Sequence, residues 1–463
     1  MKTIFRGRVR ELRVLDKKFK QDDFVMTVLY GRRRIGKTML INKFMSEHDC
    51  TQISFTSVER GEKELLSMMT ESVLTSLAPE LLGNVSFDSF EKVFDFIGKK
   101  AENERIIFFI DEYPYLVKQC PYIQSVLQKV IDTKWKNGKL FFIICGSLVG
   151  FMKDEVLAES APLHGRSNLE LKLSAFNYLE TAEFLEGYTN EEKAIFYGLS
   201  NGVAKYIEQF DTNLSLDDNI IEQFYSIGGY FSEEQIKTVV TSDRKNPGLY
   251  NSIVSAVATG HTKNGEIASY AGTDDVTYPL KVLTNAEILK KKMLKKPYYV
   301  LNDSMLEFWF RYVNRATSLI NADNGESYYR AEVKDKLHDF MGKVFEKMAM
   351  EYLMMHAGND GFPVYTDITD YQSSILDENG ERKQIEIDLL AKNGKDILLA
   401  GECKFKSSQF DKTEFDKLMD KVKYLPVSDP MVVIFSLSGF TDYVIQNAGS
   451  CRLISIDDMY EKQ

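Results

Sequence analysis

The segment GRRRIGKT, residues 31–38, constrains this chain more than any other stretch of its sequence. Two glycines separated by four residues and followed by lysine and threonine match the phosphate-binding loop consensus in full. The apolar stretch FVMTVLY precedes the loop and the stretch KTMLINKFM follows it, which gives the strand, loop and helix that the consensus requires. The alternative, a glycine turn with a solvated lysine, does not account for this context. We therefore expect an α/β domain that holds a nucleotide.

The loop and the start of the following helix supply the groups that a nucleoside triphosphate needs. Backbone N–H groups and the helix N-terminus hold phosphate anions, and Lys37 reaches the β- and γ-phosphates. The hydroxyl of Thr38 is a ligand for Mg²⁺. The residues expected to contact ATP are Gly31, Arg32, Arg33, Arg34, Ile35, Gly36, Lys37, Thr38, Met39 and Asp111, with Thr38 and Asp111 also expected to hold Mg²⁺.

Polar residues follow the later apolar runs of the same region. IIFFIDEY ends in Asp111, expected to orient Mg²⁺, and Glu112, expected to polarise the attacking water. LFFIICGS ends in Ser147, which we expect to sense the γ-phosphate or the attacking water. APLHGRS places Arg166 in a loop, where it can stabilise transition-state charge in its own chain or in a neighbour. Taken singly, these residues also suit a turn, a helix cap or an idle surface cation. After a phosphate loop they predict ATP hydrolysis.

The patterning divides the rest of the chain. Apolar runs of strand length alternate with amphipathic stretches to about residue 180, which predicts a mostly parallel sheet covered on both faces. A helical period follows, then short helices with a two-stranded turn, and finally alternating strands around the strong turn signal KNGK. The expected fold class is a multidomain α/β protein with an αβα P-loop sandwich at 1–180, a helical lid at 181–235, a winged helix at 236–312, a linker at 313–334 and a restriction-endonuclease-like α/β domain at 335–463.

Composition excludes several classes of protein. The formal charge of −10 argues against a uniformly basic coat, although one basic face is compatible with it. The five cysteines form no CxxC pair and the five histidines are scattered, so neither a disulfide framework nor a zinc site is indicated. The longest apolar runs have the length of strands, not of membrane spans. We expect a cytoplasmic protein without membrane association.

The nucleotide motifs resemble those of a prokaryotic, largely archaeal ATPase family of the AAA-like, STAND-related class. Its Gly-Arg-x-x-Glu-Leu opening, PLYGR-like loop and GGxPxYL-like helical motif correspond to GRVREL, PLHGR and NGVAKYI. The departures are His164 in place of an aromatic residue and Ala204 in place of proline. The resemblance implies a winged helix and a C-terminal nuclease-like domain of unknown function. The matching positions are Gly7, Arg8, Glu11, Leu12, Pro162, Leu163, Gly165 and Arg166.

A second group of polar residues lies near the C-terminus. Glu346 falls on a predicted helix, Asp388 on a strand in IEIDLL, and Glu402 and Lys404 on the next strand in AGECKF. Three converging carboxylates bind Mg²⁺ or Mn²⁺, and a lysine beside them positions the nucleophile or neutralises charge. The spacing resembles the PD-(D/E)xK nucleases. We expect Glu346, Asp388 and Glu402 to be metal ligands, with Asp388, Glu402 and Lys404 catalytic. The polar face of an edge strand with a surface salt bridge is the alternative.

The segment KKKMLKK, residues 290–296, is the most basic stretch. Between the expected recognition helix and the wing, its lysines would contact DNA phosphates. The alternative is a solvated helix end whose cations favour the helix dipole.

These features predict an ATP-binding and ATP-hydrolysing protein whose nucleotide state controls a winged helix and a metal-dependent DNA nuclease domain. ATP and DNA are the expected partners, and self-association into a homo-oligomer is a further expectation. One alternative is a STAND-type regulatory ATPase whose C-terminal domain is catalytically inactive and binds DNA or protein. Another is an ATP-binding scaffold without turnover.

Overall fold

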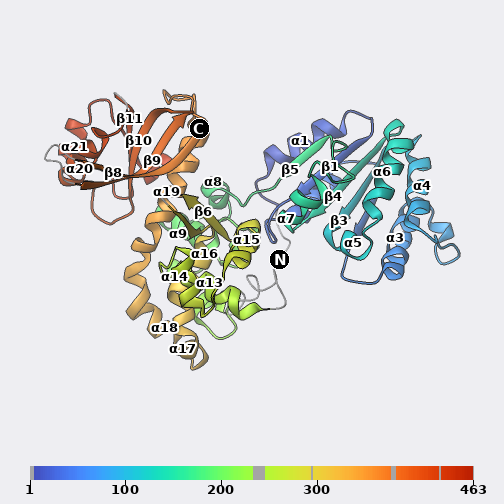
Figure 1. Ribbon diagram of the computed structural model, residues 1–463, viewed down its shortest axis with the longest axis horizontal. Helices are drawn as coiled ribbons and strands as arrows, with labels where there is room; N and C mark the ends of the chain where they lie inside the picture. Colours follow the sequence, from blue (N-terminus) through green and yellow to red (C-terminus); the bar gives the residue numbers. More distant parts are fainter. Residues whose placement is uncertain (1–4, 233–245, 294–295, 377–381, 427–428, 462–463) are drawn as a thin grey trace. The chain divides into compact units, whose positions relative to one another are not determined.

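The computed structural model describes residues 5–232, 246–293, 296–376, 382–426 and 429–461 (Figure 1). The chain forms two compact units. The first comprises residues 1–175, 203–205 and 281–287, and the second comprises residues 176–202, 206–280 and 288–463. No helix in the described ranges is both long and apolar enough to cross a membrane. The five cysteines all lie in these ranges as free thiols.

The first unit is built on a five-stranded sheet of order β2-β3-β4-β1-β5, in which every neighbouring pair is parallel. Its strands are β1 (Val25–Tyr30), β2 (Thr51–Thr56), β3 (Ile106–Asp111), β4 (Leu140–Gly146) and β5 (Leu169–Lys172). The five apolar runs at the start of the chain form these five strands, which confirms the predicted α/β fold. Because the strands are parallel, the residues that follow β1, β3 and β4 lie at one edge of the sheet.

Helices cover both faces of this sheet (Figure 1). They are α1 (Val9–Phe19), α2 (Lys37–Ser46), α3 (Glu62–Leu77), α4 (Phe90–Ala101), α5 (Tyr113–Gln119), α6 (Ile123–Thr133) and α7 (Val149–Phe151). On one face, Phe142 contacts Trp135 with ring centroids 5.1 Å apart, and on the other, Phe141 contacts Phe44 of α2 at 5.4 Å. Successive residues of β4 therefore fill two separate cores, since side chains alternate along a strand.

The second unit begins with helices, as the sequence predicts for residues up to 232. These are α8 (Tyr178–Ala182), α9 (Asn190–Ser200), α10 (Ala204–Ile207) and α11 (Leu216–Ile220). Three further helices and a hairpin follow, namely α13 (Pro247–Ala258), α14 (Asn264–Ala271), α15 (Thr277–Asn285), β6 (Leu289–Met293) and β7 (Pro297–Leu301). The first residues of α10 and the last residues of α15 belong to the first unit. The hairpin is antiparallel, and Tyr299 N donates to Thr262 O at 2.8 Å, which ties β7 to the segment before α14.

The sequence predicts that the lysine run, residues 290–296, lies between the recognition helix and the hairpin. The structure places it differently. Its first four residues, 290–293, fall within strand β6, because the strand already begins at Leu289. Lys290 and Lys291 are exposed, whereas Lys292 forms an ion pair with Asp370 at 2.7 Å. Residues 294 and 295 of this run and residues 236–245 of the predicted winged helix lie outside the described residues.

Residues 313–334, expected to form a linker, are largely helical. They include α17 (Thr317–Asn321) and α18 (Gly325–Tyr328), after α16 (Ser304–Phe308). Ile320, Tyr329 and Val333 are buried. Burial of these apolar side chains stabilises helices in a segment whose polar composition is typical of a loop. The aromatic residues Trp309 and Phe310 are buried in the core.

The rest of the second unit is a five-stranded mixed sheet of order β12-β11-β10-β9-β8. Its elements are α19 (Leu337–His356), β8 (Asp367–Leu376), β9 (Arg382–Asn393), β10 (Asp396–Lys404), α20 (Lys412–Val422), β11 (Met431–Ser436), α21 (Asp442–Asn447), β12 (Arg452–Ser455) and α22 (Ile456–Tyr460). Asn393 pairs with Asp396 across the KNGK turn, which confirms the predicted hairpin. Helix α19 packs on the sheet through Phe345 and Phe405, whose ring centroids are 5.3 Å apart.

Candidate functional site

The phosphate loop closely approaches its neighbours, and its glycines permit this. A Cβ at Gly31 would lie 2.3 Å from Leu173 O, and Gly36 has a left-handed φ of 92° at the start of α2. Lys37 Nζ donates to Gly31 O at 3.0 Å and to Arg32 O at 2.8 Å. The lysine thus folds over its own loop, with its ammonium group where phosphate oxygens can replace the two carbonyl acceptors.

Thr38 and Asp111, the two residues expected to hold Mg²⁺, are adjacent. Thr38 Oγ1 donates to Asp111 Oδ2 at 2.6 Å, which joins the first turn of α2 to the end of β3. Asp111 Oδ1 accepts from the backbone N–H of Glu112 at 2.9 Å, which fixes the carboxylate. A hydroxyl and a carboxylate are hard oxygen ligands, so this pair suits Mg²⁺.

Glu112 and Ser147 also meet at this edge of the sheet. Ser147 Oγ donates to Glu112 Oε2 at 2.7 Å, because β3 and β4 are neighbouring parallel strands and the two residues follow their ends. Glu112 has a left-handed φ of 50°, which is strained for a residue with a side chain. A strained residue with an oriented carboxylate beside a phosphate loop is typical of a catalytic position.

Arg166, expected to be available in a loop, is engaged by Asp132 on α6. Its Nε and Nη2 donate to the two carboxylate oxygens at 3.0 and 2.6 Å, and its Nη1 donates to Pro162 O at 2.9 Å. Asp132 belongs to none of the sequence motifs, so this pairing could not be predicted from them. Arg166 must leave Asp132 before it can act on a phosphate.

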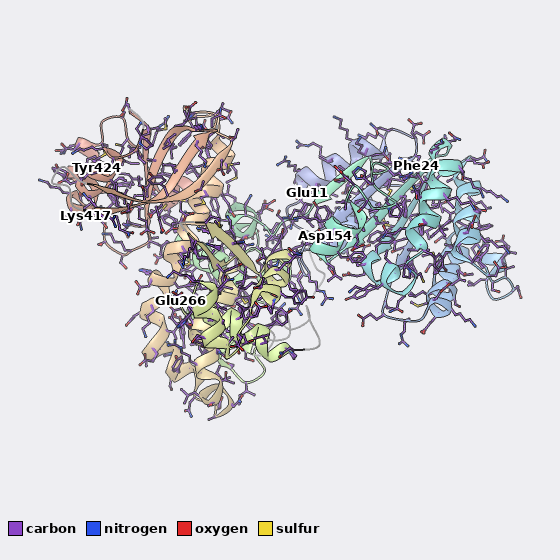
Figure 2. All side chains as sticks on the ribbon, in the orientation of Figure 1. Glu11, Phe24, Asp154, Glu266, Lys417 and Tyr424 are labelled. Atoms are coloured by element: carbon purple, nitrogen blue, oxygen red, sulfur yellow. The ribbon has the colours of Figure 1, made fainter. Side chains whose placement is uncertain are left out.

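Arg8 supports the phosphate loop from the opposite side. The buried guanidinium donates from Nη2 to Ile35 O at 3.0 Å and to Ser174 O at 2.8 Å, and Nη1 lies 3.3 Å from Glu11 Oε1. Glu11 is labelled in Figure 2. In the sequence, Arg8 and Glu11 are recognisable only as part of the family motif GRVREL. The structure gives that motif a physical role, which is to fix the loop against the segment after β5.

The C-terminal carboxylates come from α19, β9 and β10. Asp388 Oδ2 accepts from the backbone N–H of Cys403 at 2.9 Å, and Cys403 is buried. Burial and the nearby Glu402 raise the pKa of Asp388 to about 6. Burial and the charge of Asp388 raise the pKa of Glu346 to about 7. The carboxyl groups of Glu346 on α19 and Asp388 on β9 are therefore near enough to influence each other electrostatically.

Glu402 has one partner that the sequence did not indicate, Lys421. The residue is 6% exposed, and its carboxylate receives hydrogen bonds from Lys404 Nζ at 2.8 Å and Lys421 Nζ at 2.9 Å. Within the described ranges, no three acidic, histidine or cysteine side chains are grouped so that they could hold a metal ion. The expectation that Glu346, Asp388 and Glu402 form one metal site is therefore not met by this arrangement, because two ammonium groups occupy Glu402. Sequence spacing did not reveal Lys421, which comes from α20.

Comparison with known families agrees with the nucleotide site. Residues 5–210 match the profile of an ATPase domain described as predominantly from Archaea. This match spans the phosphate loop, Asp111, Glu112, Ser147 and Arg166. Residues 309–416 match a second profile, described as archaeal and bacterial proteins of unknown function.

Individual relatives extend the match beyond the ATPase domain. An uncharacterized protein of Methanocaldococcus jannaschii is 29% identical over 360 residues, which cover 76% of this chain and 77% of that protein. An uncharacterized ATP-binding protein of the same organism is 48% identical over 42 residues, covering 9% of this chain and 71% of the relative. The solved Walker-type ATPase of Pyrococcus abyssi shares the fold, with a TM-score of 0.52 and 18% identity over 66% of this chain and 96% of that one.

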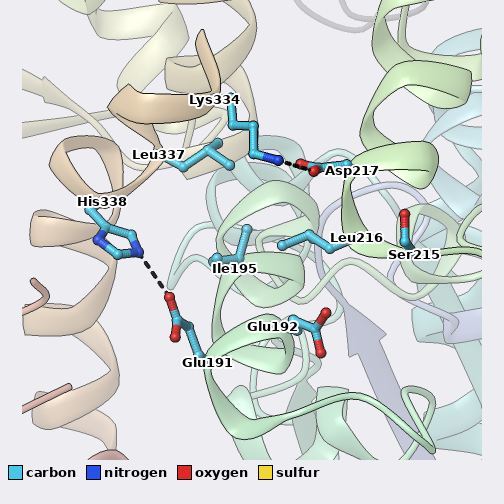
Figure 3. Close-up of a pocket in the computed structure, with 9 residues that line it drawn as sticks. All are labelled: Glu191, Glu192, Ile195, Ser215, Leu216, Asp217, Lys334, Leu337 and His338. Atoms are coloured by element: carbon cyan, nitrogen blue, oxygen red, sulfur yellow. Dashed lines mark hydrogen bonds and ion pairs between the residues drawn. The ribbon is translucent and has the colours of Figure 1, made fainter. Parts of the chain in front are cut away.

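A hollow of about 280 Å³ lies in the second unit (Figure 3). Its charged side chains pair with one another. His338 Nε2 lies 2.8 Å from Glu191 Oε1, and Lys334 pairs with Asp217. None of the residues that the sequence singled out lines this hollow.

Proposed function

We propose that the first unit binds ATP with Mg²⁺ and hydrolyses it, with Glu112 as the general base. The observation that carries this proposal is that two hydrogen-bonded residue pairs lie at one edge of the sheet. Thr38 donates a hydrogen bond to Asp111 at 2.6 Å, and Ser147 donates one to Glu112 at 2.7 Å. The Thr38–Asp111 pair offers oxygen ligands to a cation. In the other pair, Ser147 orients the Glu112 carboxylate, which accepts a proton.

In this mechanism the loop N–H groups, the α2 N-terminus and Lys37 bind the β- and γ-phosphates. Glu112 takes a proton from a water molecule, whose oxygen bonds to the γ-phosphorus. The bond from that phosphorus to the bridging oxygen breaks, and ADP leaves with the electron pair. Mg²⁺, when bound to Thr38 and Asp111, neutralises charge on the β- and γ-oxygens.

Phosphate release by the purified full chain tests this function. The wild type should release phosphate from ATP in the presence of Mg²⁺, and Lys37→Ala should neither bind ATP nor turn it over. Lys17→Ala, an exposed change on α1, is the matched control. An ATP-binding wild type without phosphate release would support the scaffold alternative and defeat the enzyme proposal.

We also propose self-association, in which Arg166 is exchanged from Asp132 to the nucleotide of a neighbouring chain. The Arg166–Asp132 salt bridge supports this proposal because it lies near the surface. The Arg166 side chain is 23% exposed, so its guanidinium group can leave Asp132 without being extracted from the core. Sedimentation with and without a non-hydrolysable ATP analogue tests this part.

We also propose a cytoplasmic location, which suits five free thiols.

DNA binding is proposed for the segment α13 to β7, as a winged helix. Three helices followed by an antiparallel hairpin support this, together with the exposed Lys290 and Lys291 on β6. Lysines on a hairpin contribute affinity by contacting phosphates, independently of sequence.

For the C-terminal sheet, the arrangement favours the regulatory alternative, in which the domain binds DNA or protein without cleaving it. The carboxylate of Glu402 is neutralised by Lys404 and Lys421, and this leaves no ready site for a divalent cation. The nuclease proposal stands on Glu346, Asp388, Glu402 and Lys404 and has a direct test. The wild type, Asp388→Ala and the exposed control Glu386→Ala are incubated with DNA in Mg²⁺, Mn²⁺ or chelator. Divalent-dependent cleavage lost only in Asp388→Ala would establish the nuclease.

A further inference from the structure

The middle arginine of the phosphate loop, Arg33, is held by a residue outside the loop. Its Nη2 donates to the hydroxyl of Tyr115 at 2.5 Å. Tyr115 lies in the first turn of α5, and its backbone N–H donates to Glu112 O at 3.0 Å. The Arg33 guanidinium is thus fastened to the same turn that presents the proposed catalytic base.

Arg33 is also electrostatically close to Lys37. Burial lowers the pKa of Lys37, and the positive charge of Arg33 lowers it further, against the opposing influence of Asp111 and Glu112. Arg33 itself is exposed at the surface of the loop. Arg33 is therefore an exposed cation near Lys37, and Tyr115 connects it to the turn that carries Glu112. This position allows it to contact the terminal phosphate of a bound nucleotide.

Arg33 and Arg166 differ in their partners. Arg166 faces a carboxylate, which neutralises its charge through two hydrogen bonds. Among the residues that the structure describes, Arg33 pairs with no carboxylate, and its partner Tyr115 is a neutral hydroxyl. A neutral partner orients a guanidinium without cancelling its charge, and the planar fork can donate to two phosphate oxygens.

We infer that Arg33 is a catalytic residue that contacts the γ-phosphoryl oxygens in its own chain, and that Tyr115 is the residue that positions it. This inference rests on the proposed ATP hydrolysis. As the bond to the bridging oxygen breaks, negative charge gathers on the γ- and bridging oxygens, and Arg33 offsets it. Arg33 thereby supplies a transition-state cation from the chain that binds the nucleotide, in addition to any contribution from Arg166.

Steady-state kinetics of substituted full-length chains test the assignment. Arg33→Gln should lower kcat about 10²- to 10³-fold while ATP still binds, and Arg33→Lys should retain part of the rate because the charge remains. Tyr115→Phe should lower kcat less and leave KM nearly unchanged. The controls Arg60→Gln and Tyr122→Phe alter exposed residues of the same types elsewhere in the unit. A kcat for Arg33→Gln within twofold of wild type would overturn the inference.

Mixing two inactive chains distinguishes action within a chain from action between chains. Lys37→Ala retains Arg33 but lacks ATP binding, whereas Arg33→Gln binds ATP but lacks the cation. Equimolar mixing should give no more phosphate release than the separate chains. Restored activity would show that Arg33 serves a neighbour and would defeat the assignment within one chain. A wild type that binds ATP without turnover would instead reject the proposed ATPase itself, a result visible before any variant is made.

Discussion

The hydroxyl of Tyr197 on α9 donates to Glu351 Oε1 on α19 at 2.6 Å and thereby joins the two helices within the second unit. The backbone N–H of Tyr178 donates to the other carboxylate oxygen at 3.2 Å. Burial raises the pKa of Glu351, although Lys347 and the hydrogen bonds from Tyr197 and Tyr178 favour the charged form. The carboxyl group is therefore more readily protonated in the folded chain than in the unfolded chain.

This pKa shift predicts a pH-dependent stability. A raised folded-state pKa means that the folded state binds more protons, so the stabilisation is present below the unfolded pKa of about 4.3 and is lost as pH rises through the folded pKa. Glu351→Gln keeps an acceptor for Tyr197 and removes the titration. In urea unfolding between pH 5 and 8, the variant should lose less stability than wild type as pH rises. The exposed control Glu222→Gln should follow wild type, and a pH-independent difference for Glu351→Gln would contradict the shift.

The paired lysines at Glu402 predict a non-additive effect on stability. Lys421→Gln should lower the free energy of unfolding by about 1–3 kcal/mol, since a buried carboxylate loses one of two charged donors. Lys404→Gln with Lys421→Gln should cost more than the sum of the single changes, and adding Glu402→Gln should recover part of the loss. Lys417→Gln, on the same helix and labelled in Figure 2, is the control. Additive single effects without recovery would show that the three groups do not act together.

The hairpin lysines predict a change in the salt dependence of DNA binding. Replacing Lys290 and Lys291 with glutamine should weaken binding similarly for all sequences and reduce the slope of log K against log salt by up to about 2. Lys17→Gln with Lys20→Gln removes the same charge from an exposed position on α1 and from the exposed residue that follows this helix, and should have a smaller effect. An unchanged slope, measured by fluorescence anisotropy, would remove β6 from the interface.

Local patterns predicted the first unit well because its determinants are local. Apolar runs bounded by turns became β1 to β5, and the loop, Asp111 and Glu112 came together because parallel strands end at one edge. Partners distant in sequence were not predictable in this way. Asp132 reaches Arg166, Tyr115 reaches Arg33 and Lys421 reaches Glu402 from helices whose exposed polar residues carry no spacing signal. The segment 313–334 was misjudged as a linker because its stabilising contacts are tertiary.

The most direct test of the ATPase account compares ATP binding and turnover in Glu112→Gln. The substitution keeps the size of the side chain and an acceptor for Ser147 but removes the carboxylate that takes the proton. Isothermal titration should give an affinity for ATP close to that of wild type, while single-turnover phosphate release should slow by about 10²- to 10⁴-fold. Phosphate release at the wild-type rate by a variant that binds ATP normally would contradict the assignment of Glu112 as the general base.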